Sequence, residues 1–201
     1  REPFNAWSHL VGLVLAAAGT GLLLRLADRT PERVAFGVYG ATLMLLYAAS
    51  AVYHALPAPP SRLRALRTLD HIAIYFLIAG TYTPFALVTL NGAWGWTLFG
   101  AVWGLALLGI VQELWLARGA RVTSLVIYLL MGWLAVVAVV PLFRALSWDG
   151  LAWLVAGGLA YTGGMVFYVY DERFRHWHGI WHLFVLAGSA LHYVAIVLFV
   201  A

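Results

Sequence analysis

Seven apolar stretches, each about 20 residues long, constrain this chain more than any other feature of its sequence. A helix needs about 20 mostly apolar residues to cross the hydrocarbon core of a bilayer. Short segments join the stretches, so we expect consecutive helices to be antiparallel neighbours and residues 1–201 to form one all-α, seven-helix membrane domain. The predicted spans are residues 9–26, 34–56, 69–90, 93–115, 122–143, 151–170 and 179–201.

The composition excludes most other classes of protein. Apolar residues make up 64% of the chain and charged residues only 10%, whereas a soluble domain has about half and a quarter. There is no cysteine, which excludes a disulfide scaffold and a thiolate metal site. The net charge of +4 comes from arginines in separate short clusters, so we expect no nucleic-acid partner.

These arginines predict the orientation of the helices, because short cytoplasmic loops carry an excess of basic residues. The N-terminus shares one side with the second, fourth and sixth loops. That side collects eight arginines: Arg1, Arg62, Arg64, Arg67, Arg118, Arg121, Arg173 and Arg175. The opposite side collects four: Arg25, Arg29, Arg33 and Arg144. We therefore predict a cytoplasmic N-terminus and a C-terminus outside the cell.

Polar and ionisable residues gather at the predicted cytoplasmic ends of several spans. Such residues are costly in a membrane and by default mark function. His178 and His182 are four residues apart, and so are Ser50 and His54; each pair therefore shares one helix face. We expect the whole group to meet at one membrane depth: Glu2, Asn5, His9, Ser50, His54, Asp70, His71, His178 and His182.

The histidines in this group predict a zinc site. Protein zinc is held mainly by nitrogen or sulfur ligands in a tetrahedron. His178 and His182 supply two ligands from one helix face, and His54 supplies a third. Three protein ligands leave a fourth position for water, as in catalytic zinc sites. We expect Asp70 to orient that water or take its proton, and Ser50 to hydrogen-bond within the site.

Simpler interpretations stay open for these residues and for others like them. A His-x-x-x-His spacing also arises by chance, and histidines at helix ends also lie among lipid headgroups without a ligand. His71 and His176 fit that second description. Asp70 also fits the N-cap of the third helix. Glu113 fits an interfacial residue at the end of the fourth span, and His192 fits a buried hydrogen-bonding residue.

Prolines and glycines predict local features of the helices. Pro84 and Pro141 each lack a backbone N–H and crowd the preceding turn, so we expect kinks there. Small residues let membrane helices approach closely. We expect such packing at six glycines: Gly100 and Gly104 in the fourth span, and Gly157, Gly158, Gly163 and Gly164 in the sixth.

Three motifs resemble the signature of the family that joins progestin and adiponectin receptors to bacterial hemolysin III proteins. They are Glu-Pro-Phe-Asn-Ala-Trp-Ser-His at residues 2–9, Ser-Ala-Val-Tyr-His at residues 50–54 followed by Asp70, and His-Gly-Ile-Trp-His at residues 178–182. Residues 69–85 and 178–193 resemble the third and seventh helices of the hemolysin III branch. The resemblance covers the whole chain.

The resemblance implies seven helices, a cytoplasmic N-terminus and a multi-pass protein of the bacterial inner membrane. It implies a zinc ion near the inner leaflet held by His54, His178 and His182. It also implies that Asp70 binds a water at the site and that Ser50 belongs to the same motif. The first motif is matched by Glu2, Asn5 and His9, for which we expect a structural or supporting role.

The resemblance leaves the activity open between two classes. The first is a zinc-dependent hydrolase of a lipid amide or ester, similar to the ceramidase activity of the receptor branch, with a sphingolipid-like or other membrane lipid as substrate. The second is a non-enzymatic receptor or regulator of membrane homeostasis in which zinc is structural. A cytolytic pore fits less well, because the polar residues gather at one end of the spans. We favour the hydrolase. The sequence defines neither the substrate nor the oligomeric state.

Overall fold

The computed structural model describes residues 2–116 and 121–201. Within these ranges the chain forms seven helical spans that are long and apolar enough to cross a membrane, and no strand. The predicted all-α, seven-span class is therefore confirmed. The helices are α1 (Pro3–Leu26), α2 (Thr30–Ala55), α3 (Pro60–Pro84) continued by η1 (Phe85–Leu90), α4 (Gly92–Val111) continued by η2 (Gln112–Leu116), α5 (Arg121–Gly132) continued by η3 (Leu134–Ala138) and α6 (Val139–Ala145), α7 (Trp148–Val169), and α8 (Trp177–Phe199).

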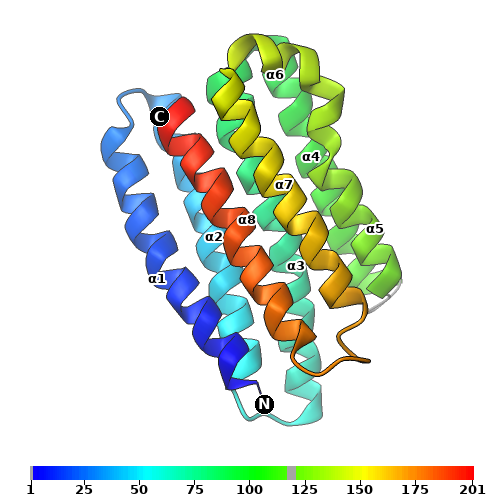
Figure 1. Cartoon of the computed structure of the whole chain (residues 1–201). Helices are drawn as coiled ribbons and strands as arrows, with labels where there is room; N and C mark the ends of the chain where they lie inside the picture. Colours follow the sequence, from blue (N-terminus) through cyan, green and yellow to red (C-terminus); the bar gives the residue numbers. More distant parts are fainter. Residues whose placement is uncertain (1, 117–120) are drawn as a thin grey trace.

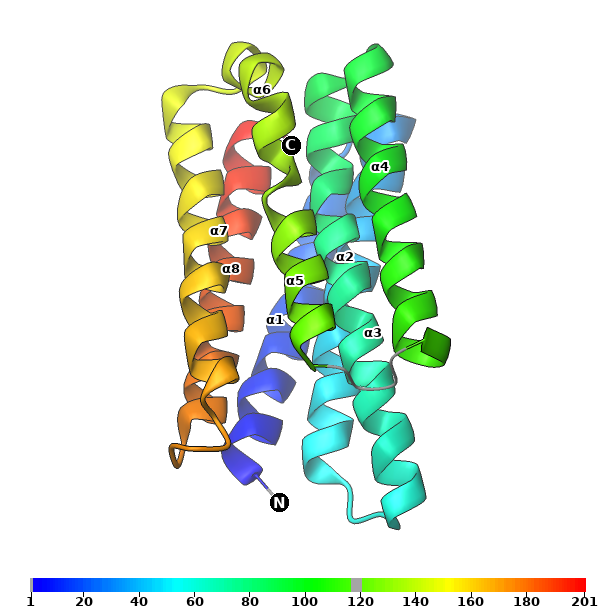
Figure 2. The ribbon, with the colours of Figure 1, turned by 90° about the vertical axis from the view of Figure 1, so that its right-hand side faces the viewer.

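The spans form one elongated bundle with the N- and C-termini at opposite ends (Figures 1 and 2). The most extensive contacts are between α1 and α2, between α2 and α3, and between α7 and α8. Helix α8 also packs against α1, whereas α5 and α7 contact each other only slightly. We call the end of the bundle at which α1 begins the N-terminal end. His54 at the end of α2 and the pair His178 and His182 at the start of α8 lie at this same end.

The bundle has a buried centre and an apolar exterior, as a membrane solvent requires. In the apolar stretches of the α2 and α3 spans, more than half of the residues are buried, against less than a third in the α1, α4, α5 and α7 spans. The largest fully buried side chains include Tyr39 and Phe36 from α2 and Tyr75 from α3. Large apolar side chains such as Leu15 and Leu108 are exposed on the outside, where they would contact lipid.

The arginines are divided between the two ends as the sequence predicts. Arg62, Arg64 and Arg67 lie in the first turns of α3, and Arg121 opens α5 at the same, N-terminal end. Arg25 and Arg144 lie in the last turns of α1 and α6 at the other end. Arg1 and Arg118 lie outside the described residues. The side of the membrane that each end faces stays a prediction.

Helix α3 begins nine residues earlier than predicted, which corrects the interpretation of Asp70. The sequence predicts a start at residue 69, but the helix starts at Pro60 with Pro59 as its N-cap residue. A proline is favoured in the first helical turn because its missing N–H would have no helical partner there. The arginine-rich segment after it is therefore helical rather than a loop. Asp70 lies inside the helix, so the N-cap interpretation is wrong.

Regular α-helix is interrupted in the third, fourth and fifth spans among the described residues. Pro84 ends α3, and the chain continues as the π-helix η1. Pro141 lies in the first turn of α6, directly after the 3-10 segment η3. Proline has no N–H to donate to the preceding turn, which disfavours a continuous α-helix there. The Tyr82 hydroxyl fills part of that break: it donates to the Gly132 carbonyl at 2.9 Å and accepts from the Ala135 amide at 2.9 Å. Regular α-helical structure therefore changes next to both prolines, while the kinks expected there stay a prediction.

Close helix packing through glycine is found in one of the two predicted places. In α7, a Cβ atom at Gly157 would lie 2.1 Å from the ring of His192, and one at Gly164 would lie 2.5 Å from Phe184. These glycines let α8 approach α7. A Cβ atom at Gly100, Gly104 or Gly158 would meet nothing within 4 Å among the described residues, so the packing role predicted for these three glycines is wrong.

Candidate metal centre

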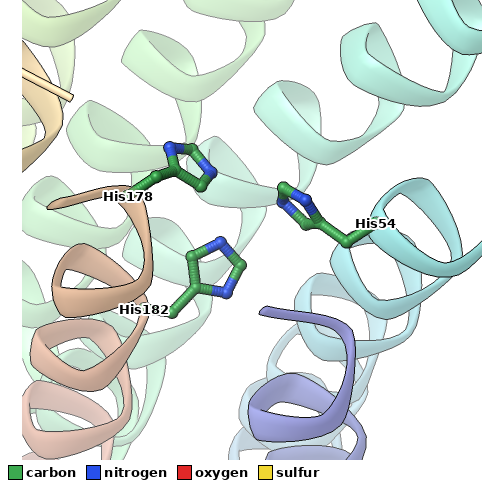
Figure 3. Close-up of side chains that lie close together, drawn as sticks. All are labelled: His54, His178 and His182. Atoms are coloured by element: carbon green, nitrogen blue, oxygen red, sulfur yellow. The ribbon is translucent and has the colours of Figure 1, made fainter. Parts of the chain in front are cut away.

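Three histidines from two helices converge at the N-terminal end of the bundle (Figure 3). His54 lies on the last turn of α2, while His178 and His182 lie one turn apart at the start of α8. Each residue offers one donor nitrogen, and these three atoms all lie within 4.8 Å of one another. The sequence therefore selects, from seven histidines, the three that the fold brings together as a group that could hold a metal ion.

The remaining hydrogen bonds of these histidines fit a metal site. His54 Nδ1 lies 2.9 Å from the Glu2 carboxylate and His178 Nδ1 lies 2.6 Å from Asp171. The buried His54 Nε2 and His182 Nδ1 atoms have no hydrogen-bond partner among the described residues. Tetrahedral zinc with Zn–N bonds of about 2.0–2.1 Å separates its ligands by about 3.4 Å. The donors, within 4.8 Å of one another, are at most about 1.4 Å farther apart than in that arrangement. Small side-chain rotations close this difference, so the residues present fit a zinc ion.

A fourth imidazole lies directly against this group. His9, on α1, is 3% exposed, and its ring centroid is 3.9 Å from that of His182. Neither of its nitrogens has a hydrogen-bond partner among the described residues. Tyr47 also contacts the His9 ring edge-on, at 5.1 Å between centroids. The first motif therefore lies beside the histidine group, as expected of a supporting role.

Asp70 and Ser50 lie in the wall of a cavity that the histidine group also lines. The cavity has a volume of about 450 Å³ and extends from His54 and His178 toward Thr81 and His192. Ser50 is buried and lies close to Asp70 in this wall. Asp70 itself is half-buried and does not belong to the group of three converging donors. The carboxylate is thus placed beside the histidines without replacing one of them.

His71 and Glu113 form a buried pair, which corrects the interfacial interpretation of both residues. His71 Nδ1 donates to Glu113 at 3.0 Å, and Ser124 Oγ donates to the other carboxylate oxygen at 2.9 Å. Glu113 is 2% exposed. The π-helical turn η2 begins at Gln112 and brings both Gln112 and Glu113 inside. His71 and Glu113 therefore belong to a polar network inside the bundle and do not lie among lipid headgroups.

The two remaining histidines match their simpler interpretations. His176 is exposed at the N-cap position of α8, with a left-handed backbone of φ 69°. It contributes nothing to the group of three. His192 is ten residues along α8 from His182, and its Nε2 donates to the Leu154 carbonyl at 3.0 Å. The hydrogen-bonding role predicted for His192 is confirmed.

Two residues beside the histidine group are missed by the sequence-based prediction. Asp171, in the segment between α7 and α8, contacts His178 and also accepts from Arg121 Nη2 at 2.6 Å. Arg121, at the start of α5, also donates to Glu172 at 3.0 Å, and its guanidinium lies 4.1 Å above the ring of Tyr168. In sequence, Arg121 counts only as a basic residue near a loop. Asp171 has no fixed helical spacing to the histidines.

Comparison with known proteins gives one consistent relationship. The family described as haemolysin-III related matches residues 1–193. The chain is 40% identical to Hemolysin-3 of Bacillus cereus, covering 100% of this chain and 92% of that protein. It is 38% identical to the Hemolysin-3 homolog of Bacillus subtilis, over 99% and 94% of the two chains. Similarity extends to the human monocyte to macrophage differentiation factor, at 33% identity over 96% of this chain and 81% of that protein.

The match over nearly the whole chain and the seven membrane-spanning helices agree with each other. The resemblance inferred from the three motifs is therefore confirmed. This chain belongs to the haemolysin-III related family of multi-pass membrane proteins.

Proposed function

We propose that this protein is a zinc-dependent hydrolase of an amide or ester bond in a membrane lipid. The observation that carries the proposal is the position of the histidine group: it lines a cavity of about 450 Å³ inside the bundle, together with Asp70 and Ser50. A volume of 300–1,000 Å³ is typical of sites that enclose small molecules. A lipid reaches such a site without leaving the membrane.

His54, His178 and His182 would hold the zinc, because their free nitrogens converge and the chain has no cysteine to compete. When bound, zinc supplies Lewis-acid polarisation of a carbonyl oxygen and lowers the pKa of water. Among the described residues, these three histidines are the only group of three or more potential ligands whose donor atoms lie close enough together to hold one metal ion. We expect the remaining coordination position to be open to water and substrate.

Asp70 would take the proton of the attacking water and return it to the leaving group. A positioned general base or acid contributes about 10²–10⁴-fold to a rate. Ser50 lines the cavity beside Asp70, where its hydroxyl would donate to the carboxylate and hold it in place. Deeper in the cavity, Leu77, Ile78 and Met165 line the wall. This apolar lining would accept an acyl chain and keep bulk water from the reacting carbonyl.

The test measures metal content and turnover on the same preparations. Wild-type protein, His178→Ala and Asp70→Ala are purified in detergent and analysed for zinc by mass spectrometry. Each is then incubated with a panel of lipid amides, including ceramide, and lipid esters. We expect about one zinc per wild-type chain, loss of zinc in His178→Ala, and retained zinc with at least 100-fold lower turnover in Asp70→Ala. Undiminished turnover in Asp70→Ala would refute the mechanism.

One observation favours a second function, in which zinc is structural. The three histidines come from α2 and α8, which are not among the extensively packed helix pairs. A metal ion would therefore connect two helices that otherwise contact little, and the protein would act as a receptor or regulator without catalysis. Full zinc occupancy without hydrolysis of any lipid in the panel would support this alternative.

A further inference from the structure

Two carboxylates from outside the histidine group each contact one of its histidines, in both cases at the Nδ1 atom of the ring. Glu2, which precedes α1, lies 2.9 Å from His54 Nδ1, and Asp171 lies 2.6 Å from His178 Nδ1. A carboxylate can only accept a hydrogen bond, so each contact requires a proton on Nδ1. The lone pair of the neutral ring is then on Nε2. Each contact thus selects the tautomer that leaves Nε2 as the free donor.

Each carboxylate is itself held by a second group. Asn5 Nδ2 donates to Glu2 at 2.6 Å, the same carboxylate oxygen that contacts His54. Arg121 Nη2 donates to Asp171 Oδ1 at 2.6 Å, while the other oxygen of Asp171 contacts His178. Arg121 is in turn packed on Tyr168 of α7. The two carboxylates are therefore fixed from α1 in one case and from α5 in the other.

We propose that Glu2 and Asp171 are positioning residues of the metal centre, and that Arg121 links the start of α5 to it through Asp171. The inference rests on the metal ion of the proposed function and is independent of catalysis. Histidines that bind metals almost always donate their other ring N–H to such a partner, which orients the ring and raises its basicity. Here two of the three histidines have that arrangement. The two carboxylates also supply negative charge beside a site for a divalent cation.

The Asp171 contact differs from an ordinary ion pair at a helix end, whereas the Glu2 side chain is 52% exposed. The Asp171 side chain is only 9% exposed although it lies in a connecting segment. By contrast, the neighbouring Glu172 pairs with the same arginine, is 85% exposed and contacts no histidine. Surface pairs of that second kind contribute little to stability. The burial of Asp171 against a histidine with a free donor nitrogen points to a role at the metal centre.

The experiment measures zinc affinity, using competition with a chromophoric chelator and the full chain in detergent. Glu2→Ala and Asp171→Ala each remove one acceptor, and Asp171→Asn removes the charge while keeping the shape. Loss of a partner of this kind typically weakens metal affinity by about 10- to 100-fold, which we expect for both alanine variants. Arg121→Gln should weaken it by about several-fold, because Asp171 then loses its anchor.

Glu172→Gln is the matched control, since it removes the other charge paired with Arg121 but touches no histidine. Its zinc affinity should equal that of wild type. The absorption spectrum of cobalt-substituted protein gives a second readout, and its bands should shift in Asp171→Asn but not in Glu172→Gln. Circular dichroism identifies any variant that fails to fold. If Asp171→Ala does not fold, the zinc affinity of Asp171→Asn is compared with wild type instead.

The outcomes separate this inference from the proposed hydrolase. Weaker zinc binding in the Glu2 and Asp171 variants, with no turnover by wild type, supports the positioning role and refutes the hydrolase. Turnover by wild type with unchanged zinc affinity in all variants refutes the positioning role alone. Absence of zinc binding by wild type refutes both.

Discussion

Replacing Glu113 with alanine should strongly destabilise the bundle, and the structure gives the expected size of the effect. The carboxylate is 2% exposed and accepts hydrogen bonds from His71 and Ser124. Hydrogen bonds between membrane helices contribute about 0.6 kcal/mol each on average, so two ordinary ones would total about 1 kcal/mol. Removing one member of a buried ion pair costs about 3–5 kcal/mol, because the other is left unpaired.

We expect Glu113→Ala to lower the free energy of unfolding by about 3 kcal/mol, at the lower end of that range. Glu113→Gln keeps one acceptor oxygen and should cost about 1 kcal/mol. In the double variant Glu113→Leu with His71→Leu, neither member of the pair leaves the other unpaired, although Ser124 loses its acceptor on Glu113. The loss should therefore be smaller than the sum of the two single losses. Glu172→Ala, an exposed carboxylate, is the control and should unfold like wild type.

The assay is equilibrium unfolding in mixed micelles of increasing dodecyl sulfate content, followed by circular dichroism and tryptophan fluorescence. Coincident transitions from both probes are required before free energies are compared. If Glu113→Ala unfolds within about 0.5 kcal/mol of wild type, the buried network does not stabilise the fold and the reasoning from burial is wrong.

Three further predictions concern the metal, the helix packing and the orientation. Removing zinc with a chelator should lower the thermal unfolding midpoint of wild type but not of His182→Ala, because a ligand at 100 times its Kd stabilises the native state by about 2.7 kcal/mol. Gly157→Ala should cost about 1–3 kcal/mol in dodecyl sulfate unfolding, since its Cβ would overlap an imidazole, whereas Gly158→Ala, which meets nothing within 4 Å, should be neutral or stabilising. The chain has no cysteine, so single cysteines at Ser61 and Asp149, on opposite ends, can report sidedness: in intact cells a membrane-impermeant maleimide should label only Asp149→Cys, and labelling of Ser61→Cys alone would reverse the predicted orientation.

The seven spans could be predicted because a bilayer imposes a length that apolar runs in the sequence display directly. Their ends could not be predicted equally well. The stretch containing Arg62, Arg64 and Arg67 has the composition of a loop, yet it continues the helix that starts at Pro60. Charged side chains at the end of a span can extend toward the headgroups while the backbone stays helical. Polarity therefore marks the edge of the membrane, which here differs from the start of the helix.

The histidine group could be predicted from local spacing together with membrane depth. His178 and His182 share a face by helical geometry alone, and antiparallel spans bring the end of α2 to the same level. Both arguments need only periodicity and the count of spans. They place His54 in the group without any knowledge of which helices are neighbours.

The partners of these histidines required the three-dimensional structure. Asp171 lies in a connecting segment, whose path no periodicity describes, and Arg121 reaches it from a span 50 residues earlier. The pairing of His71 with Glu113 joins residues 42 apart, and it depends on the π-helical turn at Gln112. Nothing in the local sequence distinguishes that turn from regular α-helix. The Asp171–His178 contact spans only seven residues, but the other missed contacts join distant parts of the chain.

The interrupted backbone of the fifth span contrasts with the unbroken helices that carry the histidines. Helices α2 and α8, which carry the histidines, are unbroken, so a complete ladder of backbone hydrogen bonds resists bending where donor positions must be maintained. Between Gly132 and Ala135, by contrast, the backbone is held partly by one tyrosine hydroxyl, and Gly132 also lines the cavity. Rotation of the single Tyr82 side chain would release both of these backbone groups. The unbroken helices α2 and α8 thus hold the histidines, and the interrupted fifth span borders the cavity that a substrate would occupy.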